Sequence, residues 1–276
     1  MTFITLLLSK IGFAMSSMPP ASHFFKGTQL EIAQAIDKAD ADLAGSLAKK
    51  IGRVELDRPG TDGMTLLMYA ANKAIPESPK RLAVVTALLR AGADALQQSP
   101  PGEGEASLIS VALLRANGGK GSAFLKALLD GGMNPDSVEY HGSGSSIIFR
   151  VANQDTPESL ELLIARGANV NAKDRLGSTP IMKALNTFSL DEVNYLLDHG
   201  ADPKVVNLLG RSFASRVFEY VNTQKNDPLK RYPKILGLRD RIIAMGVEWP
   251  PASEVVERDR MRAKGIKPII PAGEEK

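Results

Sequence analysis

Short apolar runs recur along the chain, and each of them ends at a glycine. The clearest copies are ALLRAG at 87–92, ALLDGG at 127–132, LLIARG at 162–167 and YLLDHG at 195–200, with weaker copies at 47–52 and 242–246. The equivalent glycines are Gly52, Gly92, Gly132, Gly167, Gly200 and Gly246. Glycine adopts the left-handed conformation that ends many helices, so each run predicts a helix with a glycine cap.

A second apolar run precedes each of the later glycines and opens with serine or threonine. These residues are typical helix N-caps: Thr65, Ser107, Ser146, Thr179 and Ser212. Pro180 follows one of them in the first helical turn, where its missing N–H costs nothing. The small residues Ala70, Ala112, Ala152 and Ala184 permit close helix packing. The predicted unit is therefore a turn, a helix, a short loop, a second helix and a glycine-capped turn.

This unit resembles the ankyrin repeat. The best matches are DRLGSTPIMKA at 174–184, LLDHGAD at 196–202 and the finger sequence GANVNA at 167–172. The resemblance covers residues 28–250 and implies an all-α solenoid of helix-turn-helix units with short β-hairpin-like finger turns, about five to six repeats including degenerate caps. The family's motif histidine is replaced by Met68, Ser110, Phe149, Met182 or Ser215, which leaves the usual hydrogen bonding within each repeat open, but not the fold.

The pattern predicts three parts: an N-terminal signal or disordered segment at 1–22, a repeat domain at 23–251, and a short helix with a flexible tail at 252–276. Residues 28–52 form a capping helical pair whose apolar positions predict one buried side: Leu30, Ile32, Ala33, Ile36, Leu43 and Leu47. At the other end, Ser253 is placed to cap a short helix that Gly265 stops. The mixed charges of this helix indicate that it is solvated.

Loop lengths vary between the units. The units that start at Ser146 and Thr179 are regular, whereas extra residues occur at 74–80, 115–122 and 222–233, and the finger at 97–106 is rich in proline and glycine. Insertions in a solenoid collect in loops because packed helices cannot absorb them. The lengthened loops result either from neutral sequence drift in solvent-exposed segments or from the specialisation of one edge for binding.

The first residues are apolar but do not fit one targeting class. Residues 1–15 contain a single charge, Lys10, and this run is shorter than the roughly 20 residues of a membrane span. No basic residue precedes the apolar core, although Ala14-Met15-Ser16 fits a small-x-small cleavage site. The segment is either an export signal, which implies a periplasmic protein, or an N-terminal helix of a cytoplasmic one.

Composition narrows the function classes. The chain of 276 residues is 43% hydrophobic and carries a net charge of only +3, with 5% aromatic residues. A balance this even argues against nucleic acid as a partner, because such binding needs a concentrated basic stripe. The absence of cysteine excludes disulfides, thiolate nucleophiles and cysteine-ligated metals.

No catalytic set is apparent in the sequence. There is no phosphate-binding loop, no H-E-x-x-H motif and no cluster with metal-ligand spacing. The histidines are His23, His141 and His199, and the position of His199 before a capping glycine indicates a structural role. His141 opens HGSGSS, which fails the G-x-S-x-G pattern of a nucleophile elbow. We therefore expect no enzyme activity, no metal, no cofactor and no small-molecule substrate.

Stacked repeats form a concave surface from the finger turns and the first helices. The residues expected to face that groove are Tyr69, Asn72, Arg150, Asn153, Lys183, Asn186 and Arg216. Arg150, Lys183 and Arg216 predict a basic stripe, and Tyr69 is a candidate aromatic anchor, because Arg and Tyr are frequent hot-spot residues. The partner expected from this pattern is a protein with an acidic patch.

The leading hypothesis is a non-catalytic protein-protein interaction module. The opening SHFFKGTQLEIAQAIDKAD at 22–40, the degenerate repeats and the basic tail resemble ankyrin proteins of Gram-negative bacteria. Some members of that group are exported and neutralise secreted toxins. The resemblance therefore implies an alternative, a periplasmic immunity protein against a toxin such as a type VI secretion phospholipase effector. No partner-contacting residue carries over, since the repeat motif does not fix partner contacts.

Overall fold

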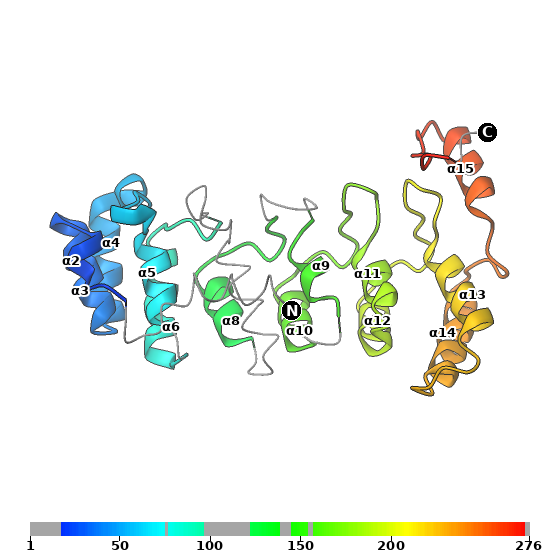
Figure 1. Ribbon diagram of the computed structural model, residues 1–276, viewed down its shortest axis with the longest axis horizontal. Coiled ribbons are helices and arrows are strands. Elements are labelled where there is room, and N and C mark those ends of the chain that lie inside the picture. The colour runs from blue at the N-terminus through cyan, green and yellow to red at the C-terminus, as the bar shows by residue number, and fades with distance from the viewer. Residues whose placement is uncertain (1–17, 75–76, 97–121, 139–144, 154–156, 274–276) are drawn as a thin grey trace. The chain divides into compact units, whose positions relative to one another are not determined.

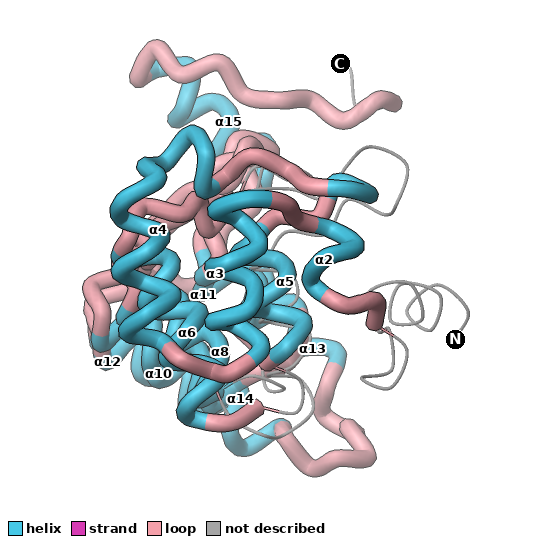
Figure 2. The backbone as a smooth tube through the Cα atoms, turned by 90° about the vertical axis from the view of Figure 1, so that its left-hand side faces the viewer, coloured by secondary structure: helices cyan, strands magenta, loops and turns pink. Residues whose placement is uncertain are grey.

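The structure is a computed structural model that describes residues 18–74, 77–96, 122–138, 145–153 and 157–273. The predicted export signal, the cap at Ser107, the finger at 97–106 and His141 lie outside these residues. The described segments are helices and loops, with one isolated antiparallel bridge between Val206 and Ser212 (Figure 2). Among these segments, no helix has both the length and the apolar character needed to cross a membrane.

The chain divides into two compact units, 1–141 and 142–276. In the first unit, helices α3 and α4 pack together, α5 and α6 stack on them, and α8 continues the row of second helices beside α6 (Figure 1). The described helices of this unit are α2 Ala21–Phe24, α3 Gly27–Asp37, α4 Ala41–Leu56, the 3-10 turn Thr61–Gly63, α5 Leu66–Lys73, α6 Pro79–Arg90 and α8 Ala123–Asp130.

The second unit repeats the same arrangement. The first helices form one row, α9 beside α11 beside α13, and each pairs with a second helix, while extended fingers project beyond the helix pairs (Figure 1). Its helices are α9 Ile148–Val151, α10 Pro157–Ala165, α11 Pro180–Asn186, α12 Leu190–Asp198, α13 Phe213–Thr223, α14 Tyr232–Ala244 and α15 Glu254–Ala263. This is the all-α solenoid that the sequence predicts.

The predicted glycine caps are confirmed at five of the six positions, whereas Gly52 lies at a kink inside α4, Ala41–Leu56, and does not end that helix. Gly52, Gly92, Gly132, Gly167, Gly200 and Gly246 have φ between 74° and 105°. At most of these sites the following N–H bonds back to the carbonyl five residues earlier, as from Ala93 to Leu88 and from Ala201 to Leu196. This is the Schellman arrangement, which satisfies the carbonyls at a helix end and turns the chain into the next finger.

The predicted N-caps divide into two groups. The Thr65 hydroxyl accepts a bond from Met68 N, and Ser212 forms a capping box with Ser215. The Thr179 side chain makes no cap bond, and Ser146 lies one residue before Ile147, the N-cap of α9. Neither buried hydroxyl has a hydrogen-bond partner in the part of the chain that the structure describes. The expectation of side-chain capping was therefore wrong at these two positions.

A physical reason for these unpaired hydroxyls lies three residues further along. The motif histidine is replaced there by Phe149 and Met182, and these side chains offer the hydroxyl no strong hydrogen-bonding group. Both hydroxyls remain inside the packed unit, since Ser146 is 6% and Thr179 2% exposed. The two units with the most regular spacing therefore lack the hydrogen bonding that the motif histidine usually provides within a repeat.

The N-terminal helical pair forms as predicted, with one error in its buried face. Ile32, Ala33 and Ile36 are buried, but Leu43 is 44% exposed. Helix α4 instead turns its small residues inward, and a Cβ atom at Gly45 would lie 3.2 Å from Ala87 Cβ on α6. Close packing of α4 on α6 selects the small-residue face, which leaves Leu43 outside.

The C-terminal helix is less solvated than its charges suggest. Ser253 caps α15 and Gly265 ends it at φ 73°, as predicted, but Arg258 and Met261 are only 6% and 8% exposed. Beyond the helix, Ile269 N donates to Leu208 O at 2.7 Å. Residues around 269 therefore dock on the finger, and the division of the chain at 22 and 251 remains a prediction.

The two serine caps give a matched test of these hydrogen bonds. Ser212→Ala should lower the free energy of unfolding by about 1 kcal/mol, because it leaves the Ser215 N–H without its cap. Ser146→Ala should leave it unchanged or slightly higher, because that hydroxyl has no partner to lose. Urea unfolding followed by circular dichroism measures both, and equal losses would contradict the assignment.

Candidate functional site

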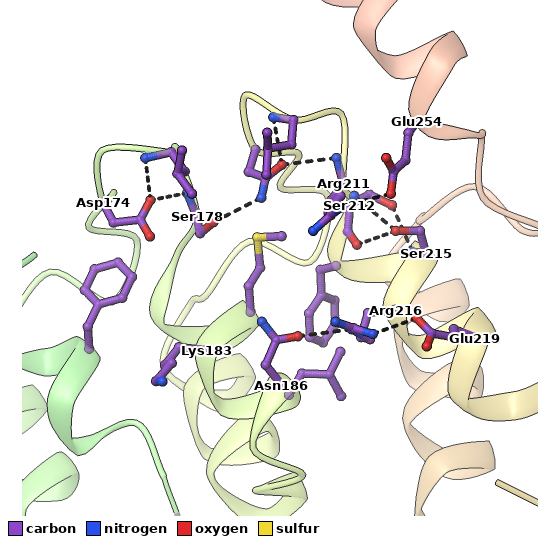
Figure 3. Close-up of a pocket in the computed structure, with 17 residues that line it drawn as sticks. Asp174, Ser178, Lys183, Asn186, Arg211, Ser212, Ser215, Arg216, Glu219 and Glu254 are labelled. Atoms are coloured by element: carbon purple, nitrogen blue, oxygen red, sulfur yellow. Dashed lines mark hydrogen bonds and ion pairs between the residues drawn. The ribbon is translucent and has the colours of Figure 1, made fainter. Parts of the chain in front are cut away.

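A groove of about 590 Å³ runs between helices α11 and α13 and the fingers above them (Figure 3). We call it the α11–α13 groove. Its lining residues are Phe149, Asp174, Leu176, Ser178, Met182, Lys183, Leu185, Asn186, Asn207, Leu209, Arg211, Ser212, Phe213, Ser215, Arg216, Glu219 and Glu254. All of them belong to the second unit.

The floor of the groove is apolar and fixed by packing. Phe213 and Leu185 are almost fully buried, at 0% and 1% exposure, and Met182 is 8% exposed. Phe213 follows the capping serine of α13, so the capping box sets where its helix begins. These side chains have almost no accessible surface and therefore support the groove from below, whereas Leu176, an apolar lining residue that a partner can reach, is 40% exposed.

Two finger segments form the upper wall. Asp174 Oδ1 accepts bonds from Leu176 N and Ser178 N, and Asn207 Oδ1 accepts from Leu209 N and Arg211 N. The fingers are joined to each other, since Leu208 N donates to Leu176 O at 2.7 Å and Asn207 Nδ2 donates to Ser178 Oγ at 3.1 Å. The wall is therefore a hydrogen-bonded pair of turns.

Most charges in the groove are already paired. Arg216 Nε donates to Asn186 Oδ1 at 3.1 Å and its Nη1 to Glu219 Oε2 at 2.7 Å, and Arg211 pairs with Glu254 at 3.2 Å (Figure 3). Lys183 lies on α11 and, among the described residues, its ammonium has no carboxylate partner. Lys183 is thus the cation of this groove that is available to a partner.

The structure brings together three of the residues predicted to face the groove: Lys183, Asn186 and Arg216. Arg150 lies exposed on α9, but the α9 residue that lines the groove is Phe149. Asn153 follows α9 and donates from Nδ2 to Arg150 O at 2.7 Å, so its amide is used within its own turn. The predicted site is therefore partly assembled in the second unit.

Tyr69 requires a correction. Its side chain is 0% exposed, with the ring edge against Phe25 and the hydroxyl donating to Asp37 Oδ1 at 2.8 Å. Burial raises the pKa of the Tyr69 phenol above its usual range, and the bond to Asp37 adds to that effect. Tyr69 is a core residue of the first unit and not an exposed anchor, while Asn72 in the same helix is half-buried.

Several groove residues have no marker in the sequence pattern. Leu176, Leu209 and Arg211 come from fingers. Glu254 comes from α15 and pairs with Arg211, which lies 43 positions earlier in the sequence. Glu219 does have a local signal, since it lies one helical turn after Arg216. That spacing predicts the pairing that removes Arg216 from the basic stripe.

The insertion at 222–233 folds back onto the preceding repeat. Asp227 accepts bonds from Arg231 N at 2.9 Å and from Arg231 Nε at 2.9 Å, and the guanidinium lies 4.3 Å from the centre of the Phe188 ring. Phe188 in turn stacks on Tyr220 at 4.0 Å. The hydrogen bonds from Arg231 lower the pKa of Asp227 to about 2.

The described residues contain no group of three or more His, Asp or Glu side chains placed to hold a metal. His199 lies with Nδ1 2.8 Å from Tyr195 O, and its ring packs on the Tyr195 ring at 4.1 Å. Both of these contacts are with Tyr195, one helical turn before His199.

Comparison with known proteins identifies the repeat. A family model described as ankyrin repeats, in three copies, matches residues 110–207. Residues 110–207 of the chain therefore contain ankyrin repeats. Ankyrin repeats are protein-interaction modules and in general non-catalytic, which agrees with a groove that has an apolar floor and paired charges.

Relatives with ankyrin repeats match the chain only in part. The putative ankyrin repeat protein FPV219 of Fowlpox virus (strain NVSL) is 32% identical over 85 residues, which are 31% of this chain and 20% of that protein. The chain spans between 20% and 48% of the length of the curated viral relatives that it matches.

Two solved structures are similar in fold. The ankyrin repeat domain of Bcl-3, a member of the IkappaB protein family, has a TM-score of 0.53 and 23% identity, over 76% of this chain and 85% of that one. A chain from the complex of the Bd0816 predatory endopeptidase of Bdellovibrio bacteriovorus with immunity protein Bd3460 has a TM-score of 0.48 and 21% identity, over 75% of this chain and 97% of that one. The first of these likenesses shows the fold alone.

The Asp227–Arg231 pair gives a pH-dependent prediction. The pKa of Asp227 lies below its ordinary value of 3.8 in the folded protein, so its contribution to stability is complete above pH 3.8 and is lost as the pH falls through about 2. The difference in unfolding free energy between the wild type and Asp227→Asn should therefore narrow across that interval. Urea unfolding at a series of pH values measures it.

Asp191→Asn serves as the control for this prediction. Asp191 also pairs with a cation, Lys234, but its side chain is 77% exposed, whereas that of Asp227 is 2% exposed. Exposed ion pairs contribute little to stability, so the control should differ little from the wild type near neutral pH. A gap between wild type and Asp227→Asn that stays constant down to about pH 2 would contradict the assignment.

Proposed function

We propose that the second unit binds a partner protein in the α11–α13 groove, and that the partner supplies an apolar side chain and a carboxylate. The observation that carries the proposal is Lys183, a cation that lines the groove and has no carboxylate partner among the residues that the structure describes. Leu176, which is 40% exposed in the wall of the groove, accepts the apolar group, and the ammonium attracts the carboxylate. Interfaces of this kind combine a desolvated centre with polar contacts around it.

The paired arginines change the expected partner. A stripe of three free cations favours a broad acidic patch, but Arg216 is held by Asn186 and Glu219. Arg211 is likewise held by Glu254. These pairs keep the two arginine side chains in fixed positions around the groove, and they leave Lys183 as the positive charge that a partner's carboxylate can neutralise. The proposed partner segment is therefore amphipathic, with one carboxylate and not a run of them.

Charge reversal at Lys183 tests this groove. A photo-crosslinking residue at Asn186 first captures and identifies the partner, and the same residue placed at Lys225 on the insertion reports background capture. Lys183→Glu should then weaken the affinity of the captured partner about tenfold, because a like charge replaces the attractive one. Calorimetric titration measures the dissociation constants.

Lys225→Glu is the matched control, since it makes the same charge change on an exposed residue that does not line the groove. The control should leave the affinity within about twofold of the wild type. Equal losses in the two variants would show a general charge effect, and the groove assignment would then fall.

The narrower alternative, a chain that neutralises a secreted toxin, stays a proposal with a separate test. It predicts that an equimolar amount of the chain abolishes the activity of the captured partner. An adaptor leaves that activity unchanged. N-terminal sequencing of the mature protein shows whether the first residues are removed, as the periplasmic form of this alternative requires.

A further inference from the structure

A second hollow, of about 470 Å³, lies between the fingers of the second unit and helix α15. We call it the lysine hollow. It shares no residue with the α11–α13 groove, and its lining consists of Asn171, Lys173, Thr179, Asp202, Lys204, Val205, Val206, Glu257, Arg260, Met261, Lys264 and Ile266. Its walls therefore come from two successive fingers and from the C-terminal helix with the residues that follow it.

The lining carries an excess of positive charge. Lys173, Lys204, Arg260 and Lys264 face two acidic residues, Asp202 and Glu257, so four positive against two negative charges leave +2. Arg260 is committed, because its Nη1 bonds to Glu248 and to Glu257, both at 2.9 Å. This pairing lowers the pKa of Glu248 and raises that of Arg260.

The three lysines, unlike Arg260, are not held in ion pairs in the described residues. Within the described part of the chain, none of them pairs with a carboxylate. Lys204 Nζ lies beside the backbone at Gly246, just after helix α14, where a Cβ atom would be 3.3 Å away. The ammonium thus faces a helix C-terminus, which favours positive charge without neutralising it.

The polar groups between the lysines are occupied by the fingers themselves. Asn171 Oδ1 accepts from Asp202 N at 2.8 Å, and its Nδ2 donates to Gly200 O at 2.9 Å. Asp202 Oδ1 accepts from Lys204 N at 2.8 Å. These bonds hold the finger backbones from which the side chains of Lys173 and Lys204 extend.

The remaining lining makes the hollow less aqueous than an open surface. Val205 is 7% and Met261 8% exposed, and both are apolar. Thr179 also lines the hollow, and its hydroxyl is a buried group with no partner. Lys173, Lys204 and Lys264 are themselves exposed, so water screens the charge of each one, and the attraction for an anion depends on several of them acting together.

We infer that the lysine hollow binds a phosphoryl group as a dianion, contributed either by free phosphate or by a phosphorylated residue of a partner. The +2 balance matches a dianion, and the lysines approach from three segments, as a tetrahedral group with several acceptor oxygens requires. The bound group would join Lys173 and Lys204 on the fingers to Lys264 after α15, and would hold α15 on the fingers. This site shares no lining residue with the proposed groove.

The test uses the full chain and titrates it with inorganic phosphate at constant ionic strength, with sodium chloride as the balancing salt. Nuclear magnetic resonance of the lysine side chains should show saturable shifts, and hydrogen exchange of the α15 amides should slow. Lys204→Gln/Lys264→Gln should weaken phosphate binding about tenfold, since two of the three free cations are lost. Lys225→Gln/Lys230→Gln removes the same charge from the insertion and should change the affinity less than about twofold.

Two peptides of equal net charge separate the sources of the anion. A phosphoserine peptide should compete with free phosphate for the wild-type site, whereas a glutamate peptide should not. If the phosphoserine peptide competes and binds more tightly than free phosphate, the ligand is a phosphorylated partner. If the peptide binds more weakly than free phosphate, the ligand is phosphate itself. No saturable phosphate binding, equal loss in the two double variants, or preference for the glutamate peptide would each overturn the inference.

Discussion

The left-handed glycine just past the end of the second helices α6, α8, α10, α12 and α14 is the constraint that turns the chain out of each of these helix pairs. Its φ lies between 80° and 105° at these five positions, a region that side chains with a Cβ atom rarely adopt. The turn reverses the chain at a fixed point, so each finger starts from the same place relative to its helix pair. In the second unit, Gly200 thereby positions the finger that carries Lys204 and Arg211, which belong to the lysine hollow and the groove respectively.

The helices and their caps could be predicted from the sequence because their signals are local. A capping glycine, a proline in the first turn and an apolar run all act within a few residues of each other. The burial of Tyr69 could not be predicted in the same way. Its ring is covered by Phe24 and Phe25, at the end of a short helix more than 40 positions earlier, and that helix has no repeat signature. A repeat pattern predicts an exposed first-helix position, and the N-terminal cap overrides it.

The charges of the groove show the same division between local and distant signals. The pair between Arg216 and Glu219 follows from helical spacing, and this pairing reduces the predicted basic stripe. The pair between Arg211 and Glu254 depends on α15 lying against the finger, where a Cβ atom at Gly210 would approach Glu254 O to 2.5 Å. Glycine is needed there for packing, and nothing in the local sequence distinguishes it from a glycine needed only for a turn.

The fingers that form the wall of the groove also form the wall of the lysine hollow. Asp174 and Asn207 hold turns on the groove side, while Asn171 and Asp202 hold them on the hollow side, and the backbone bond between Leu208 and Leu176 joins the two fingers. Helix α15 contributes Glu254 to one site and Arg260 to the other. An anion that fixes α15 on the fingers would therefore also restrain the carboxylate that pairs with Arg211. The two sites are separate in their contacts but share one mechanical support, and this support is the hydrogen-bonded finger pair and not the helices.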